Sequence, residues 1–157
     1  MGDTFKTIRL RQAVSAVLFR NGKFLMVAGA DWPEGAWCFP QGGLDIDEKH
    51  FDAVQRELKE ELGTDKFRVL MKSKTEHMYL FPQKIQEKKK CEGQYQTIWF
   101  AEFLGEFDEI SMNAQELSRY SWFDKEDVVK SMMYPEQKEV FEKVLDELSK
   151  LQKEGII

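Results

Sequence analysis

The sequence predicts an α+β fold in which a β-sheet lies between helices. Two apolar, β-prone runs at residues 13–19 and 24–28 are joined by an Asn-Gly turn, which is the strongest short-range signal for an antiparallel hairpin. Further β-prone runs are bracketed by two segments whose apolar residues repeat with helical spacing, at residues 51–62 and 135–153. Because each of these helices has one apolar face, together they can cover both faces of a sheet.

The other elements follow from local composition. The remaining β-prone runs occur, in chain order, at residues 67–71, 77–81, 97–104 and 121–123. Residues 126–132 suggest a short helix. The last helix is expected to begin at Pro135, since proline is favoured in the first helical turn. Its buried face should carry Val140, Phe141, Val144, Leu148 and Leu151.

The length of the chain and its composition indicate one domain. With 157 residues and 42% hydrophobic content, residues 1–157 are expected to form a single domain with a core of its own. Cys38 and Cys91 provide neither a disulfide framework nor the spacing of a zinc site. The sequence has no long apolar run of about 18 residues and no signal-type N-terminus. We therefore expect a cytoplasmic protein with no membrane and no disulfide partner.

The charge distribution restricts the way in which nucleic acid could be bound. A net charge of −5 argues against broad, nonspecific binding, because such binding depends on neutralising many phosphates. It is compatible with a reaction at one RNA end. The main basic cluster comprises Lys84, Lys88, Lys89 and Lys90, in a polar segment that is expected to be a loop. This cluster is either a solvated surface or a contact for a polyphosphate or an RNA strand.

The segment from Gly42 to Gly63 combines a glycine turn with an acidic helix. At 3.6 residues per turn, Glu57, Glu60 and Glu61 fall within one arc about 100° wide. A separate apolar stripe lies beside this arc and comprises Phe51, Val54, Leu58 and Leu62. The helix therefore has a buried side and, next to it, a strongly acidic side.

Signals at both ends of the acidic helix set its expected limits. Asp45 or Asp47 is suited to cap its start, and Gly63 stands where a left-handed C-terminal cap is expected. Three carboxylates this close repel one another by about a few tenths of a kcal/mol per exposed pair. A hard divalent cation such as Mg²⁺ or Mn²⁺ would compensate this charge. The spacing by itself leaves a simply solvated acidic face as the alternative.

Gly42, Glu48 and the run Arg56-Glu57-Leu58-Lys59-Glu60-Glu61-Leu62-Gly63 together resemble the Nudix box. This box is the signature of hydrolases that cleave nucleoside diphosphates linked to another moiety. Thr64 departs from the pattern, which has an aliphatic residue there, so a packing contact is weakened but no ligand is lost. The resemblance implies a Nudix α/β/α sandwich with a mixed central sheet.

The resemblance also implies roles for individual residues. Two or more Mg²⁺ or Mn²⁺ ions would be held by the set Gly42, Glu57, Glu60, Glu61 and Glu116. Arg56 would orient the glutamates by ion pairing, and Glu48 would be an accessory ligand. We favour Glu57 as the general base, with Glu61 and Glu116 as the alternatives.

Residues 37–43, Trp-Cys-Phe-Pro-Gln-Gly-Gly, look like a motif of one Nudix branch. This branch comprises the bacterial RNA 5′ pyrophosphohydrolases and the plant-type asymmetric diadenosine tetraphosphate hydrolases. A second motif of the branch resembles Gly93-Gln94-Tyr95-Gln96 followed by Trp99-Phe100, with one residue inserted. The expected substrate-binding set is Arg11, Gln41, Gly43 and Tyr79, to which Lys84 of the basic cluster is added. Tyr79 would stack on a purine or order the phosphate chain.

The other aromatic and histidine residues receive different expectations. Trp32 lies in a loop with aspartate, proline and glycine and is expected to make an exposed contact. The other three tryptophans are expected to belong to the core, namely Trp37, Trp99 and Trp122. His50 and His77 have the spacing of neither a metal pair nor a catalytic triad, so no catalytic role is assigned to them.

These residues predict a metal-dependent hydrolase of phosphoanhydride bonds in nucleoside polyphosphates. The expected reaction removes pyrophosphate from 5′-triphosphorylated RNA, cleaves diadenosine tetraphosphate asymmetrically to ATP and AMP, or does both. The alternative is a noncatalytic Nudix-like module that binds a nucleotide and regulates a partner. Such modules often lack glutamates of the box, whereas all of them are present in this sequence.

Overall fold

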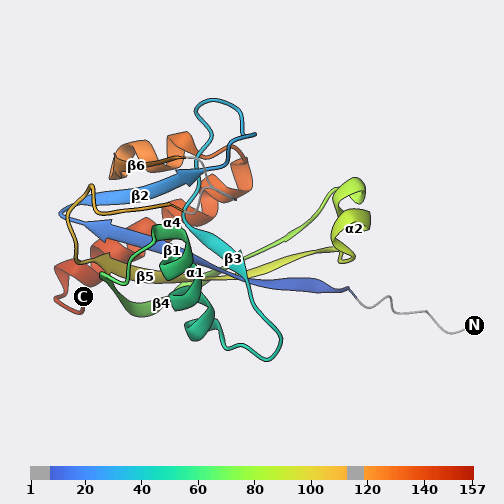
Figure 1. The fold of residues 1–157 in the computed structure, drawn as a ribbon, viewed down its shortest axis with the longest axis horizontal. Coiled ribbons are helices and arrows are strands. Elements are labelled where there is room, and N and C mark those ends of the chain that lie inside the picture. Colours follow the sequence, from blue (N-terminus) through green and yellow to red (C-terminus); the bar gives the residue numbers. More distant parts are fainter. Residues whose placement is uncertain (1–7, 113–118) are drawn as a thin grey trace, which may run out of the picture.

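Six strands form one sheet within residues 8–112 and 119–157, which are the residues described by the computed structural model (Figure 1). Their order across the sheet is β4-β5-β1-β2-β6, and β3 also pairs with β1. The strands are β1 (Leu10–Arg20), β2 (Lys23–Ala28), β3 (Gln41–Gly43), β4 (Phe67–Leu80), β5 (Gly93–Phe103) and β6 (Arg119–Asp124). β1 and β5 are parallel, whereas the other neighbouring strands are antiparallel. The predicted mixed sheet is therefore confirmed.

The predicted hairpin joins β1 and β2. Asn21 and Gly22 at its turn have φ values of 48° and 76°, and a tight turn of this kind requires positive φ at both central residues. Asparagine and glycine adopt this backbone conformation at lower cost than other residues do. The Asn-Gly pair thus sets the register of these two strands, in which Phe19 is paired with Phe24.

Helices cover both faces of the sheet (Figure 1). α1 (His50–Leu62) packs on one face, and α4 (Pro135–Lys153) packs on the other. The short α3 (Lys125–Val128) and the 3₁₀ turn η1 (Val129–Ser131) lie on the same face as α4. This arrangement confirms the predicted α/β/α sandwich of the α+β class.

Alternate side chains of β2 pack into two hydrophobic cores, one on each face of the sheet. Leu25 and Val27 pack with α1, whereas Phe24 and Met26 pack with α4. Leu58 of α1 is completely buried, and burial of a leucine side chain contributes about 1.5–3 kcal/mol. These contacts hold the acidic helix firmly against the sheet.

Several details of α1 differ from the prediction. Neither aspartate caps the helix: its N-cap is Lys49, without a side-chain hydrogen bond, because Asp47 adopts a positive φ of 62° before the helix begins. Gly63 forms the predicted left-handed C-cap, with a φ of 65°. Phe51 is 45% exposed rather than buried and instead contacts the ring of Trp99 at 5.7 Å between centroids.

The structure also corrects the predicted elements after α1. The two β-prone runs at 67–71 and 77–81 belong to one long strand, β4, whose pairing with β5 is interrupted by register shifts. The basic segment is not a loop, because α2 (Gln83–Lys89) forms there and ends at Lys90 in the left-handed conformation. In α4, Leu145 is buried with Phe141, Val144 and Leu148, whereas Val140 and Leu151 are partly buried.

β4 and β5 extend past the body of the domain, and α2 lies at the tip of this arm (Figure 1). The N-terminal part of β1 runs beside β5 along the same arm. Side chains from three strands can therefore meet at its base. In the part of the chain that the structure describes, the helices are too short or too polar to cross a membrane.

Candidate active site

The sheet register places three polar side chains in one row across three strands. Tyr79 of β4 is paired with Gln94 of β5, which is paired with Arg11 of β1. Residues at one register position project from the same face of a sheet. Hydrogen bonds join the row: Arg11 Nη1 donates to Gln94 Oε1 at 3.0 Å, and Gln94 Nε2 donates to Tyr79 Oη at 3.0 Å. A cation, an amide and a phenol are thereby fixed relative to one another.

A second row lies two residues further along these strands. His77 is paired with Gln96, and Gln96 Nε2 donates to Gln41 Oε1 of β3 at 2.8 Å. His77 and Gln96 are both buried. Buried polar side chains are retained where their hydrogen bonds are formed, so this row fixes the amide of Gln41 next to the glycine pair of β3.

The glycine pair of β3 makes room for two charged side chains. A Cβ on Gly42 would lie 2.0 Å from Cδ of Glu57, and a Cβ on Gly43 would lie 2.5 Å from Nη2 of Arg11. A side chain at either glycine would displace one of these charged groups. The space beside β3 is therefore reserved for the carboxylate of α1 and the guanidinium of β1.

Arg56 organises the acidic side of α1. Its guanidinium donates to both carboxylate oxygens of Glu48, each at 2.9 Å, and to the carbonyl oxygen of Gly43 at 2.9 Å. It also donates to Glu57 Oε1 at 2.9 Å and to Glu60 Oε2 at 3.3 Å. The hydrogen bond from Arg56, followed by one from the backbone of Asp45, lowers the pKa of Glu48 to about 2. Glu48 therefore stays ionised and keeps Arg56 in place.

The structure places the predicted metal ligands at different depths. Glu60 is exposed, whereas Glu61 is 5% exposed and Glu57 lies between these extremes. Glu116 lies outside the described residues. Among residues 8–112 and 119–157, no three His, Cys, Asp or Glu side chains converge closely enough to form a metal site as they stand. Arg56 Nη1 lies between Glu57 and Glu60 and bonds to both, so these carboxylates already share one cation.

A small polar cavity of about 230 Å³ joins the two rows to the acidic helix. It is lined by Arg11, Gln41, Gly42, Gly43, Glu57, Tyr79, Lys89 and Gln94. Four of the five expected substrate contacts therefore meet in one place. Lys84 is not among them, since it is exposed on α2 and lines neither cavity.

Lys89, one turn and a half further along α2, takes the position expected of a basic contact. Its ammonium lies 5.2 Å from the centroid of the Phe81 ring. Burial, followed by repulsion from Arg11, lowers the pKa of Lys89. Arg11 and Lys89 both line this small cavity, which is therefore suited to a strongly charged anion. Such an anion would accept charge-assisted hydrogen bonds from both cations and favour their charged forms.

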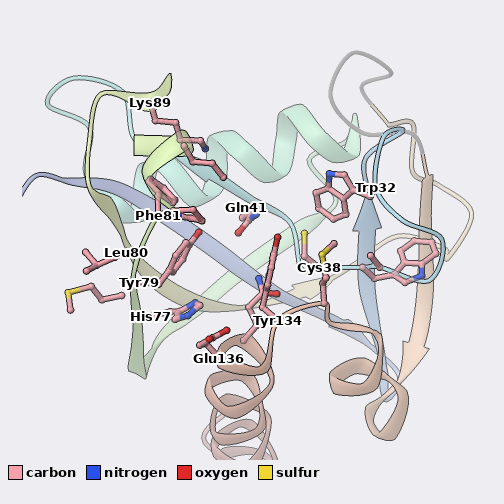
Figure 2. A pocket seen from close by; sticks show the side chains of 17 residues that line it. Trp32, Cys38, Gln41, His77, Tyr79, Leu80, Phe81, Lys89, Tyr134 and Glu136 are labelled. Carbon is pink, nitrogen blue, oxygen red and sulfur yellow. The ribbon is translucent and has the colours of Figure 1, made fainter. Parts of the chain in front are cut away.

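A larger cavity of about 760 Å³ lies next to the polar one (Figure 2). The two cavities share Gln41, Tyr79 and Lys89. Aromatic and apolar side chains form most of its wall, including Trp32, Trp37, Tyr79, Phe81 and Tyr134. A volume of this size is typical of small-molecule sites. The combined space can hold a planar ring at one end and a chain of phosphates at the other.

The tryptophans only partly follow the sequence-based expectations. Trp32 lines the large cavity, but it is partly buried and covers Gly29, where a Cβ would lie 2.8 Å from Trp32 Nε1. Trp37 packs on the core and also lines this cavity. Trp99 and Trp122 pack on the core, as expected. Cys38 is buried as a small apolar residue, and burial raises the pKa of its thiol.

Several residues of the site were not identified from the sequence. Gln94 and Gln96 belong to the motif after β4, but the motif alone does not indicate what they bind. Tyr134 and Glu136 carried no signal, because they precede or begin an ordinary amphipathic helix. His77 has the spacing of neither a metal pair nor a triad in the sequence, yet it lines the large cavity.

In this α/β/α sandwich the acidic helix shares one cavity with the cations of Arg11 and Lys89. The fold and the site together define an enzyme that acts on polyphosphates. The chain belongs to the NUDIX family, since a model of the NUDIX domain matches residues 9–144. An RNA pyrophosphohydrolase of Bartonella tribocorum is 35% identical over 90% of this chain and 91% of its own length. One from the Wolbachia of Brugia malayi is 30% identical over 95% and 96%. The protein is a Nudix hydrolase.

Solved structures support the same fold. An Escherichia coli dihydroneopterin triphosphate pyrophosphohydrolase superposes with a TM-score of 0.70 at 16% identity, covering 88% of this chain and 97% of its own. A Caenorhabditis elegans Ap4A hydrolase in a binary complex superposes with a TM-score of 0.67 at 22% identity, covering 89% and 98%. At these identities the similarity establishes the fold.

Proposed function

We propose that this Nudix hydrolase removes pyrophosphate from 5′-triphosphorylated RNA, cleaves diadenosine tetraphosphate to ATP and AMP, or does both. The observation that carries the proposal is that the two cavities lie side by side and share Gln41, Tyr79 and Lys89 in their walls. A purine nucleoside would occupy the aromatic cavity. Its phosphates would extend past Arg11 and Lys89 toward Glu57. Both proposed substrates present a nucleoside followed by a polyphosphate, and the names of the bacterial relatives favour the RNA end.

Two or more Mg²⁺ or Mn²⁺ ions are proposed to be held by Gly42, Glu57, Glu60, Glu61 and Glu116. The donor chemistry fits, because carboxylate and carbonyl oxygens are the ligands that hard cations prefer. The space that a Cβ on Gly42 would fill is occupied by the carboxylate of Glu57, so this carboxylate lies against the backbone of Gly42. Bound ions would neutralise phosphate charge and lower the pKa of a water molecule.

Side chains of the protein would bind the phosphates, position the acidic residues and accept a proton during phosphoanhydride cleavage. Arg11 and Lys89 would bind nonbridging phosphate oxygens and orient the chain. Arg56, bonded to Glu48 and Glu57, would hold the acidic side chains in place during the reaction. Glu57 is proposed as the general base that accepts a proton from the attacking water. Glu61 and Glu116 are the alternatives for that step.

The proposal is tested by incubating purified protein with Mg²⁺ and either triphosphate-ended RNA or diadenosine tetraphosphate. Pyrophosphate or ATP and AMP should appear, and EDTA should stop their release until Mg²⁺ is restored in excess. Glu57→Gln should reduce turnover at least 100-fold, about the loss expected when a general base is removed. Glu139→Gln is the matched control, since Glu139 is 76% exposed and pairs with Lys143 on α4.

Two results would contradict the proposal. Nucleotide binding without any release of phosphate would favour the noncatalytic module. Full activity in the Glu57→Gln variant would remove that residue from the mechanism. Values of kcat/KM for the two substrates at matched concentrations would identify the preferred one.

We also propose a cytoplasmic location. Cys38 and Cys91 are both free thiols in the structure, and reduced thiols are the usual state in the cytosol. Fractionation of cells that express the tagged protein would test the location, and recovery in an extracytoplasmic fraction would contradict it.

A further inference from the structure

One buried group of the aromatic cavity has no assigned role. His77 is 5% exposed and lines the large cavity. Its Nε2 atom is buried and has no hydrogen-bond partner among the described residues. A buried polar atom without a partner is costly, so a ligand that bonds to this nitrogen would recover the loss. Burial lowers the pKa of His77, and nearby Glu136 and a side-chain hydrogen bond with Gln96 partly oppose this effect.

Glu136 supplies a carboxylate at the same end of the cavity. It lies in the first turn of α4 and lines the cavity with His77. Figure 2 shows both side chains below the space bounded by Tyr79 and Tyr134, at the end away from Lys89. A planar base between the two tyrosines would thus present one edge to Glu136 and His77.

The two side chains have complementary hydrogen-bonding properties. An ionised carboxylate only accepts hydrogen bonds, and a neutral imidazole protonated on Nε2 donates one there. The Watson–Crick edge of guanine offers two adjacent donors, N1–H and the N2 amino group, beside the acceptor O6. Adenine offers the opposite order, with the acceptor N1 beside the N6 amino donor. The hydrogen-bonding groups at the polar end of the cavity are therefore complementary to the Watson–Crick edge of guanine and not to that of adenine.

We propose that Glu136 and His77 select a guanine base: the Glu136 carboxylate accepts from N1–H and the N2 amino group, and His77 Nε2–H donates to O6. This inference rests on the proposed function, because it identifies the base of the same nucleoside polyphosphate. The preferred substrates would then be polyphosphates of guanosine, such as diguanosine tetraphosphate or RNA with a guanosine at the recognised position.

The experiment measures dissociation constants for GMP and AMP and kcat/KM for diguanosine and diadenosine tetraphosphate. The wild-type protein should favour guanine about 5- to 150-fold, the discrimination that a bidentate contact to a base provides. Glu136→Gln should bring this ratio to one or below, because an amide can donate to N1 of adenine and accept from its N6 amino group. Glu139→Gln, on the same helix but outside the cavity, should keep the wild-type ratio.

A second variant tests the buried ring. His77→Phe retains an aromatic ring but lacks the donor, so it should weaken GMP binding more than AMP binding. Thermal unfolding of each variant checks that the fold is intact. If His77→Phe is unstable, the guanine-to-adenine preference of Glu136→Gln decides the question, because Glu136 is exposed and its replacement should not disturb the fold.

The outcomes separate the inference from the proposed function. Hydrolysis of both dinucleotides without a preference, or an unchanged ratio in Glu136→Gln, would overturn guanine selection and leave the hydrolase standing. Selective GMP binding with no hydrolysis of any polyphosphate would support the inference and overturn the proposed activity. Failure of both nucleotides to bind would overturn the assignment of the cavity.

Discussion

Arg56 and Glu48 form a two-point ion pair across the start of the acidic helix. Arg56 Nε donates to one carboxylate oxygen and Nη2 to the other, both at 2.9 Å. The geometry matches the planar fork of guanidinium to the two oxygens of a carboxylate. Because the same guanidinium bonds to Glu57, the pair determines where the proposed general base lies.

The Arg56–Glu48 pair predicts how stability changes with pH. Folding lowers the pKa of Glu48 from 4.5 to about 2. A depressed carboxylate pKa contributes stability that is fully present above the unfolded value and is lost as pH falls through the folded value. The free energy of unfolding of the wild-type protein should therefore exceed that of Glu48→Gln at pH 7. This excess should shrink between about pH 4.5 and 2.

Denaturant unfolding of both proteins at a series of pH values measures this difference. Glu34→Gln is a suitable control, since Glu34 is exposed in the loop after β2 and its replacement also removes one carboxylate. A difference between wild type and Glu48→Gln that stays constant from pH 7 to pH 2 would contradict the role of Arg56.

Arg56→Lys should lower activity while preserving the positive charge. A lysine ammonium is a compact donor and cannot hold Glu48, Glu57 and the carbonyl oxygen of Gly43 together. We expect kcat/KM to fall about 10- to 100-fold, the usual cost of removing a group that orients metal-binding residues. Steady-state kinetics at saturating Mg²⁺ measure the loss. Wild-type kinetics in this variant would show that charge alone is sufficient.

Gly42→Ala should harm activity more than stability. The new Cβ would meet the end of the flexible Glu57 side chain, which can rotate away at little cost to the fold. A displacement of about 1 Å in a reacting group can reduce the rate about 100-fold, so a loss of this order is expected with little change in melting temperature.

Gly63→Ala provides the contrast to this result. Its Cβ would lie 2.2 Å from the backbone oxygen of Ser111, and the position has a φ of 65°. Both the close backbone contact and the positive φ disfavour alanine, so this variant should lose stability. Calorimetry combined with kinetics separates the two cases. Equal losses of stability in both variants would contradict the proposed reason for Gly42.

Tyr79→Ala should weaken substrate binding, whereas Tyr79→Phe should weaken it less. Stacking on an aromatic side chain contributes about 1–3 kcal/mol per base, so the alanine variant should raise KM about 5- to 150-fold. Phenylalanine keeps the ring and loses only the hydrogen bond from Gln94. If both variants behave alike, the hydroxyl rather than the ring carries the contribution of Tyr79.

The sequence revealed elements whose signals are local. Asn21 and Gly22 marked the first hairpin because they tolerate positive φ, and Gly63 marked the end of α1 for the same reason. Spacing along one helix was enough to group Glu57 with its neighbouring glutamates. The capping aspartates were predicted wrongly, since a competing turn with positive φ at Asp47 precedes the helix.

The part of the site that lies on several strands could not be derived in this way. Arg11 and Gln94 are 83 residues apart in sequence, and they meet only because β1 and β5 pair in parallel in one register. Likewise, the orientation of α2 brings Lys89 rather than Lys84 to the cavity. No local periodicity encodes such choices.

By itself, the sequence determined the acidic helix, the glycine pair and the family, because backbone preference and residue spacing act over a few residues. Only the tertiary structure decided that Tyr134 and Glu136 line the aromatic cavity together with Tyr79. The physical reason is that strand register and the docking of α4 depend on packing between distant segments, which minimises exposed apolar surface over the whole domain.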